Sequence, residues 1–197
     1  ALSLAVSGSV DEPVASVKVN GQAATLSGQN FLLDSLPLLE GNNNIVVTAT
    51  DLAGNSASTA RSITQDMTPP HISITVPTEG MLTSLAQIDI SGSVDEPITA
   101  LTLNGGPVAY TDQSFNLSSV PLVEEFNLLT LTATDRAGNI GSTSVSVRRD
   151  SIAPNPPLLS QPLSPTNQAV TEINGTAEAG SSVALSIQRP DGSQELL

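Results

Sequence analysis

Hydrophobic and polar side chains alternate along several short segments of the chain. Leu129, Leu131 and Ala133 alternate with threonines, and residues 45–50 show the same alternation in an earlier segment. Successive side chains of a β-strand point to opposite faces, so a period of two places these apolar residues on one face. The pattern therefore predicts strands with one buried face and one face in water.

The most complete series of such segments lies between residues 67 and 150. Clusters of turn residues separate the segments, and Asn104-Gly105 is the strongest hairpin signal among them. The predicted strands cover residues 72–76, 87–94, 98–103, 108–111, 114–120, 127–135 and 141–148. Seven short strands separated by turns are typical of an immunoglobulin-like β-sandwich.

The sequence repeats itself with a period of 84 residues. The run Ser-Gly-Ser-Val-Asp-Glu-Pro begins at Ser7 and again at Ser91, and Ala-Gly-Asn begins at Ala53 and again at Ala137. A fixed period of this kind indicates an array of similar domains. The predicted fold class is therefore all-β, with tandem seven-stranded immunoglobulin-like β-sandwich domains.

The repeat divides the chain into three units. Residues 1–66 are predicted to form a first unit without its opening strand, and residues 67–150 a complete second unit. Residues 151–197 are predicted to be a truncated third unit, because Asn174-Gly175 begins a weaker copy that ends at Leu197. Half-built units leave unpaired strand edges, so self-association through these edges is one alternative to consider.

Composition excludes several classes of partner. The net charge is −13 and the chain has only six lysines and arginines, which is too few for a phosphate-binding surface, so we expect no nucleic-acid partner. No apolar run approaches the length of a membrane span, so we expect no membrane insertion by this segment. The absence of cysteine favours a bacterial exported protein over an animal one.

Several motifs in the repeat carry a family resemblance. They are Val19-Asn20-Gly21, Phe31, Pro37-Leu38, Glu40-Gly41-Asn42, the run from Ile45 to Asp51, and Ala53-Gly54-Asn55. Together they resemble the bacterial immunoglobulin-like repeats named after domain B of glucodextranase, and residues 173–180 are similar to a related repeat class in giant bacterial adhesins. The resemblance implies a secreted or cell-surface bacterial protein. Because the family includes both adhesins and enzyme accessory modules, it leaves the function open.

No set of residues suggests catalysis, and we predict that the chain is not an enzyme. His71 is the only histidine and there is no cysteine. The chain therefore offers few of the residues that Ser-His-Asp catalysis and zinc ligation require. Phe31 and Phe115 occupy equivalent repeat positions, which favours a role in the core. Only Tyr110 and Phe126 remain as candidates for an exposed sugar-binding platform.

Acidic residues gather in loops that the sandwich topology places at one end of each unit. For the second unit they are Asp66, Asp95, Glu96 and Asp135, with Asn139 beside them. For the first unit they are Asp11, Glu12 and Asp51, with Asn55. Calcium is bound by oxygen atoms of carboxylates, amides and carbonyls, so Ca²⁺ is the candidate cofactor. The alternative is that these are solvated turn residues, because Asp and Asn favour turns.

These observations favour a mechanical function. The expected function is that of structural stalk or spacer repeats in a secreted bacterial surface adhesin or extracellular filament, with neighbouring repeats of the same protein as partners. The alternative is an accessory module of a secreted polysaccharide-degrading enzyme.

Overall fold

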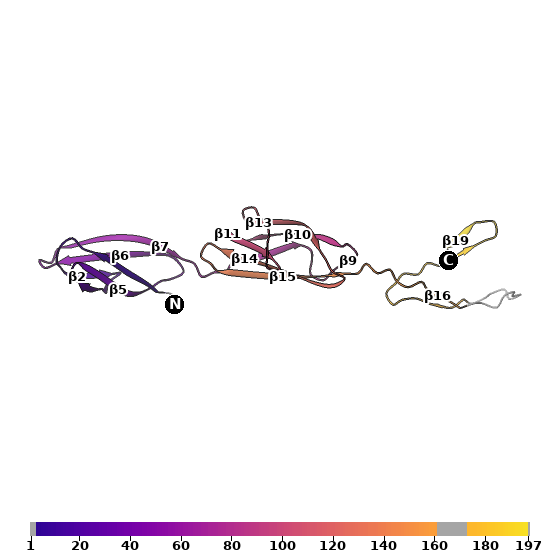
Figure 1. Cartoon of the computed structure of the whole chain (residues 1–197), viewed down its shortest axis with the longest axis horizontal. Helices are drawn as coiled ribbons and strands as arrows, with labels where there is room; N and C mark the ends of the chain where they lie inside the picture. Colours follow the sequence, from indigo (N-terminus) through magenta and orange to yellow (C-terminus); the bar gives the residue numbers. More distant parts are fainter. Residues whose placement is uncertain (1–2, 161–172, 197) are drawn as a thin grey trace.

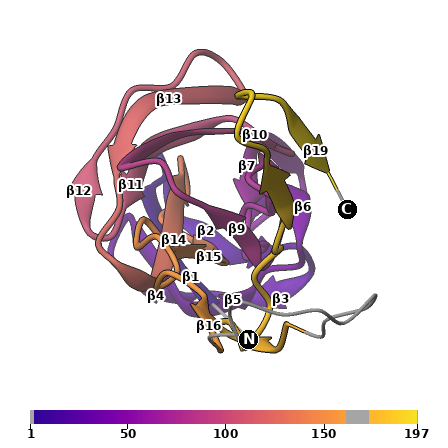
Figure 2. The same cartoon turned by 90° about the vertical axis from the view of Figure 1, so that its right-hand side faces the viewer.

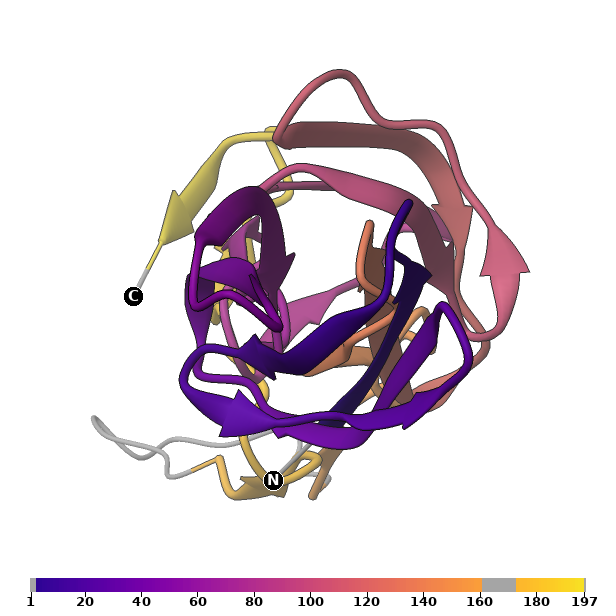
Figure 3. The same cartoon turned by 90° about the vertical axis from the view of Figure 1, so that its left-hand side faces the viewer.

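The structure is a computed structural model that describes residues 3–160 and 173–196. These residues form β-strands and turns without any helix, which confirms the all-β prediction. Two β-sandwiches follow one another along the long axis, and the C-terminal part continues in the same direction (Figure 1). Seen from either end, the strands of the two sandwiches overlap around a common axis (Figure 2 and Figure 3). The described residues include no helix long and apolar enough to span a bilayer.

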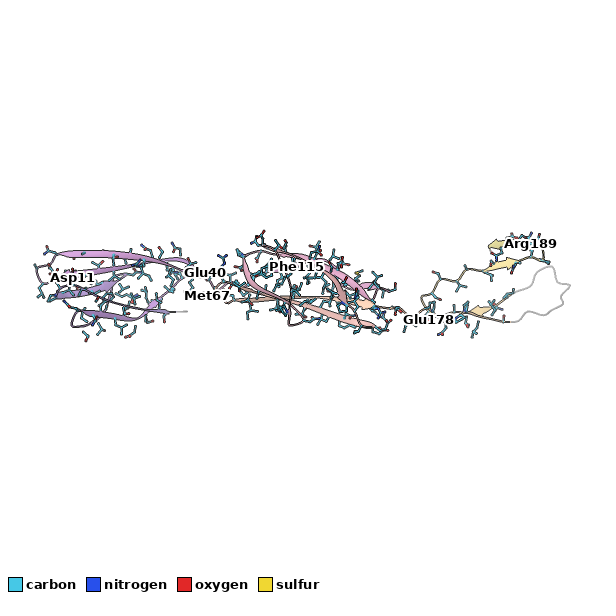
Figure 4. The ribbon with its side chains drawn as sticks, turned by 45° about the horizontal axis from the view of Figure 1, so that its top comes forward. Asp11, Glu40, Met67, Phe115, Glu178 and Arg189 are labelled. Carbon is cyan, nitrogen blue, oxygen red and sulfur yellow. The ribbon has the colours of Figure 1, made fainter. Side chains whose placement is uncertain are left out.

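Residues 72–149 form two facing sheets. The first sheet contains, in order, β13 (Ser114–Pro121), β10 (Gln87–Val94) and β8 (Ile72–Val76). The second sheet contains, in order, β12 (Gly106–Pro107), β11 (Ile98–Leu103), β14 (Glu125–Asp135), β15 (Ile140–Arg149) and β9 (Met81–Thr83). Ile90 from the first sheet and Leu131 and Val147 from the second are fully buried between them. Phe115 lies within this middle sandwich (Figure 4).

The opening strand of this unit differs from the prediction because it is divided between the two sheets. β8 pairs with β10 in the first sheet, and β9 pairs in parallel with β15 in the second. Pro77 follows β8 and has no N–H for the ladder, and Gly80 makes the turn between the two pieces at φ 72°. Residues 72–149 therefore contain eight strands instead of the predicted seven.

The predicted strand at residues 108–111 is also wrong. This segment forms only the isolated bridge between Thr111 and Ser114, and the short β12 pairs with β11 just before it. Tyr110 packs against the core and its hydroxyl lies 3.3 Å from the carbonyl oxygen of Ile98, which holds the segment beside β11. In the first unit, where Leu26 takes the place of Tyr110, the equivalent residues do form a strand.

Residues 3–65 repeat this arrangement. One sheet contains, in order, β1 (Ser3–Ser9), β5 (Asn30–Pro37) and β4 (Thr25–Ser27). The other contains, in order, β3 (Gln22–Ala23), β2 (Val14–Val19), β6 (Gly41–Asp51) and β7 (Ser56–Gln65). Val17, Val19, Phe31, Leu36 and Ile45 form a separate core. Among the described residues 3–65, no strand pairs with the outer edges of β1 and β7, whereas β8 and β9 cover the corresponding edges in the second unit.

The C-terminal part does not close a sandwich. Its strands, β16 (Leu158–Leu159), β17 (Gly175–Thr176), β18 (Ser186–Gln188) and β19 (Gln194–Leu196), form two separate two-stranded sheets. No side chain is buried in residues 151–160 or 173–195, so these short pairs share no apolar core. That residues 1–66, 67–150 and 151–197 are separate units remains a prediction, which unfolding measurements can test.

Candidate functional site

The tight turn between β14 and β15 holds one buried carboxylate in place. Asp135 is 2% exposed and accepts hydrogen bonds from the backbone N–H groups of Gly138 (2.7 Å) and Asn139 (2.9 Å). The side-chain amide of Asn139 donates a third bond at 2.8 Å. Burial acts to raise the pKa of Asp135, but these hydrogen bonds outweigh it and lower the pKa below its usual value. Asp135 is therefore ionised at neutral pH.

Two more carboxylates converge on Asp135 at the joint between the sandwiches. Asp66 comes from the segment that links them and Glu96 from the loop after β10, and oxygen atoms of all three lie within 4.8 Å of one another. Burial raises the pKa of Glu96, and the charges of Asp66, Asp135 and Asp95 raise it further. None of the three ion pairs in the described residues includes this group. Its negative charge is therefore not balanced by a basic side chain.

The other two residues predicted for this site have different roles. Asp95 is exposed and its carboxylate accepts a hydrogen bond from the backbone N–H of His71 at 2.8 Å, outside the converging group. Asn139 donates from its side-chain amide to the carbonyl oxygen of Asp66 at 3.1 Å, as well as to Asp135. Of the five predicted residues, three carboxylates come together and two residues hold the surrounding backbone.

The first unit has the equivalent turn between β6 and β7, but its acidic residues do not converge. Asp51 accepts bonds of 2.8 Å from the backbone and the side chain of Asn55, and the side-chain bond is the largest cause of its lowered pKa. Asp11 and Glu12 line a shallow cavity of 170 Å³ beside these two residues. No group of three carboxylate oxygens converges there within the described residues. Asp11 lies at the end of the sandwich opposite Glu40 (Figure 4). The segment that links the two units therefore contributes no carboxylate to this end.

The joint also contains a carboxylate that the sequence did not single out as a ligand. Glu40, in the turn before β6, accepts hydrogen bonds from the backbone N–H of Met67 at 3.0 Å and from the hydroxyl of Thr68 at 3.2 Å. Asp66 accepts a bond from the N–H of Thr68 at 3.1 Å. Glu40 and Met67 lie side by side between the sandwiches (Figure 4). The linking segment is thus held by Glu40 of the first sandwich and by Asp95 and Asn139 of the second.

The second joint, 84 residues later, repeats the backbone hydrogen bonds of the first. Glu124 accepts hydrogen bonds of 2.8 Å from both the backbone N–H and the hydroxyl of Ser151, and these bonds lower the pKa of Glu124. Asp150 accepts from the N–H of Ile152 at 3.2 Å. Glu178 accepts a hydrogen bond from the N–H of Asn155 at 3.2 Å. The recurrence of Glu40 as Glu124 in the repeat was the signal that could have identified this role.

The carboxylate group has the chemistry of a hard-cation site. Asp66, Glu96 and Asp135 together offer six oxygen atoms, and oxygen ligands suit Ca²⁺ or Mg²⁺ better than softer metals. Ca²⁺ takes roughly six to eight oxygens in flexible geometry, so water molecules would supply the ligands that the three carboxylates do not. The residues present therefore fit a divalent cation. Among them, Asp135 is the one held rigidly by its own turn.

Comparison with known proteins gives one match at the family level. Residues 2–67 match the family model described as glucodextranase, domain B, which confirms the resemblance for the first unit. No curated protein matches the sequence.

Several solved structures are similar to the chain. A tetra-tandem repeat from the extending region of a large adhesion protein is 24% identical over 99% of this chain, with a TM-score of 0.37. This chain spans 58% of that structure. Fibronectin(III)-like modules of CbhA from Clostridium thermocellum are 12% identical over 76% of this chain and 86% of theirs, with a TM-score of 0.38. Protocadherin gammaB7 repeats are 16% identical over 93% of this chain and 55% of theirs, with a TM-score of 0.44.

Proposed function

We propose that this chain is a structural spacer in a secreted bacterial surface adhesin or extracellular filament. The observation that carries the proposal is that the same backbone hydrogen bond to a glutamate recurs at both joints. Glu40 and Glu124 each reach from the end of one unit to the first residues of the following link. A spacer must keep its units in line, and repeated bonds at each joint provide this.

The linking segments themselves favour an extended joint. Thr68 is followed by Pro69-Pro70, and Ala153 precedes the second proline-containing link. Proline fixes its own φ and keeps the preceding residue in extended conformations, so a link of this kind acts as a semi-rigid connector. Two sandwiches placed end to end with such a link extend the chain along one direction (Figure 1).

We further propose that Ca²⁺ binds between Asp66, Glu96 and Asp135. A cation there would neutralise three carboxylates that otherwise repel one another. Because Asp66 belongs to the link and the other two residues to the second sandwich, the cation would fix the link against that sandwich. Calcium would thus stiffen the joint, while Glu40 holds the link from the other side.

The alternative role as a sugar-binding accessory module has less support from the side chains. Tyr110 packs on the core with its hydroxyl on the carbonyl of Ile98. Phe126 is 64% exposed, and the other aromatic side chains of the described residues, Phe31 and Phe115, are buried. A single exposed ring does not form a platform on which several sugar rings can stack.

Small-angle scattering of the whole chain tests the spacer proposal. We expect an elongated particle, because the two sandwiches are held in line and the C-terminal part extends beyond them. A compact domain of 197 residues would have a radius of gyration of about 16 Å. The expected radius is clearly larger, with a pair-distance distribution that has a long tail. A value near that of a compact domain would contradict end-to-end packing.

A further inference from the structure

An exposed apolar patch lies on the outer face of the second sandwich. Phe126 and Leu128 of β14 are 64% and 54% exposed, and Leu82 of β9 is 66% exposed. Arg148 of β15 pairs with Phe126 on one side and with Leu82 on the other, so its side chain lies between them. A contiguous apolar patch with polar residues at its rim is typical of an interaction site. We call these four residues and Glu125, which bonds to Arg148, the outer patch.

The first sandwich does not have this patch. At the positions 84 residues before Phe126, Leu128 and the arginine between the strands it has Asn42, Asn44 and Thr64. Asn42 and Asn44 are exposed although the second sandwich follows them, so a following unit does not cover this part of the sheet. The apolar residues are therefore specific to the second sandwich, and the fold of the repeat does not require them.

Glu125, at the rim of the outer patch, has a backbone conformation that favours glycine. Its φ is 69°, and its counterpart in the first sandwich is Gly41 with a φ of 85°. The left-handed region is strained for a residue with a side chain. The Oε2 atom of Glu125 lies 3.0 Å from Nε and 2.9 Å from Nη2 of Arg148, but an exposed ion pair contributes little to stability. The stability of the monomer therefore does not account for a glutamate at this position.

Two copies of the outer patch are complementary to each other. Arg148 gives the patch a positive group in a chain of net charge −13. A two-fold axis that runs along the strands, between β14 and β15, places β14 of one copy over β15 of the other. Because Phe126 and Arg148 are paired across these strands, each Arg148 then meets Phe126 and Glu125 of the second copy. Arginine stacks on aromatic rings and pairs with carboxylates, so the same surface serves both copies.

We propose that the outer patch joins two copies of this chain side by side. β14 and β15 run along the long axis of the chain (Figure 1), so copies related by this axis point in the same direction. The contact is small and both chains are acidic, so the association is weak. In dilute solution the chain is monomeric, and the contact then adds nothing to its stability. This inference does not depend on the spacer role or on calcium.

Charge-exchange variants of the whole chain test the proposal by sedimentation equilibrium. Arg148→Glu and Glu125→Arg each place like charges across the contact, so each variant alone should associate about tenfold more weakly than the natural chain. In an equimolar mixture of the two variants, every such pair again has opposite charges. The mixture should therefore associate within about threefold of the natural chain. A folding defect cannot produce this result, because mixing does not repair a misfolded chain.

The apolar part of the contact is tested by residues that the first sandwich already has. Phe126→Asn should weaken association by about tenfold, because it removes the aromatic side chain that Arg148 covers. Ile140→Ser is the matched control, since it also introduces the first-sandwich residue, Ser56. Ile140 is 63% exposed on the same pair of strands but at their other end, so its replacement should leave association unchanged.

Glu125→Gly separates association from folding. Glycine adopts a φ of this kind without strain, so in dilute solution the melting temperature should be equal or higher, while association weakens because the carboxylate is lost. A lower melting temperature with unchanged association would overturn the role of Glu125 in the contact. A natural chain that stays monomeric at every concentration, or a mixture that associates no better than its components, would overturn the proposal.

Discussion

Replacement of Leu131 by alanine is expected to lower the free energy of unfolding of the second sandwich by about 2–5 kcal/mol. Leu131 is 0% exposed at the centre of β14, and truncating it leaves a cavity that neighbouring side chains cannot fill completely. Calorimetry of the whole chain should therefore show one transition shifted to lower temperature. The transition of the first sandwich should stay in place, because its apolar cluster is separate from that of the second.

Leu128→Ala is the matched control for this experiment. It makes the same chemical change three residues away on the same strand, but Leu128 is 54% exposed. Its effect should stay within about 0.5 kcal/mol. If Leu131→Ala moved a single transition of the entire chain, the sandwiches would not be separate folding units, and the proposed boundary between residues 66 and 67 would be wrong.

Calcium is expected to raise the melting temperature of the second sandwich by about 6–20 °C. Extracellular calcium modules have dissociation constants of about 0.1–1 mM. At ten to a hundred times that concentration, binding to the folded state alone stabilises it by about 1.4–2.7 kcal/mol. Each kcal/mol shifts the melting temperature of a domain of this size by about 4–8 °C. The measurement is thermal unfolding in about 10 mM CaCl₂ and in chelator.

Glu96→Gln separates this effect from general salt stabilisation. Burial and the neighbouring acids raise the folded-state pKa of Glu96. Protonated Glu96 therefore favours the folded state at low pH, and this contribution to the free energy of unfolding is lost as pH rises through the folded-state pKa. At neutral pH in chelator, Glu96→Gln should therefore raise the melting temperature by removing repulsion. In calcium it should reduce the calcium-induced shift, because one ligand is weakened.

Glu125→Gln is the control for the lost charge. Glu125 lies at the other end of β14 from Asp135 and pairs with Arg148 on the surface, so its removal should leave the calcium-induced shift unchanged. The calcium proposal fails if the natural chain shows no shift, or if Glu96→Gln and the natural chain respond equally to calcium.

The sequence predicted regular strands well because their signal is local. Ile72–Val76 and Gln87–Val94 have the predicted bounds, since alternation and flanking turn residues are contained within each segment. β9 was missed because Met81–Thr83 is too short to alternate and pairs in parallel with a strand far away in sequence. Strand pairing over such a separation leaves no local pattern.

The candidate site was predictable in its location but not in its geometry. The sandwich topology places the loops that carry Glu96 and Asp135 at the same end as Asp66, and the structure does bring these three together. Asp95 is adjacent to Glu96 in sequence, yet it binds the N–H of His71 instead. Whether Asp95 or Glu96 faces Asp135 depends on the path of the segment that links the two sandwiches. The hydrogen bonds of Glu40 were not predicted for the same reason, because its partners are residues of that link.

The stiffness of the joint between the two sandwiches is the central claim, and a distance measurement across it is the direct test. The chain has no cysteine, so Ser35→Cys and Ser118→Cys, both exposed, can carry spin labels, one on each sandwich, for pulsed electron resonance. If the joint is stiff, the distance between the two labels should have a single narrow distribution. Glu40→Ala should broaden this distribution, whereas Glu12→Ala, at the end of the first sandwich away from the joint, should leave it unchanged. A broad distribution in the natural chain, unchanged by Glu40→Ala, would contradict the spacer.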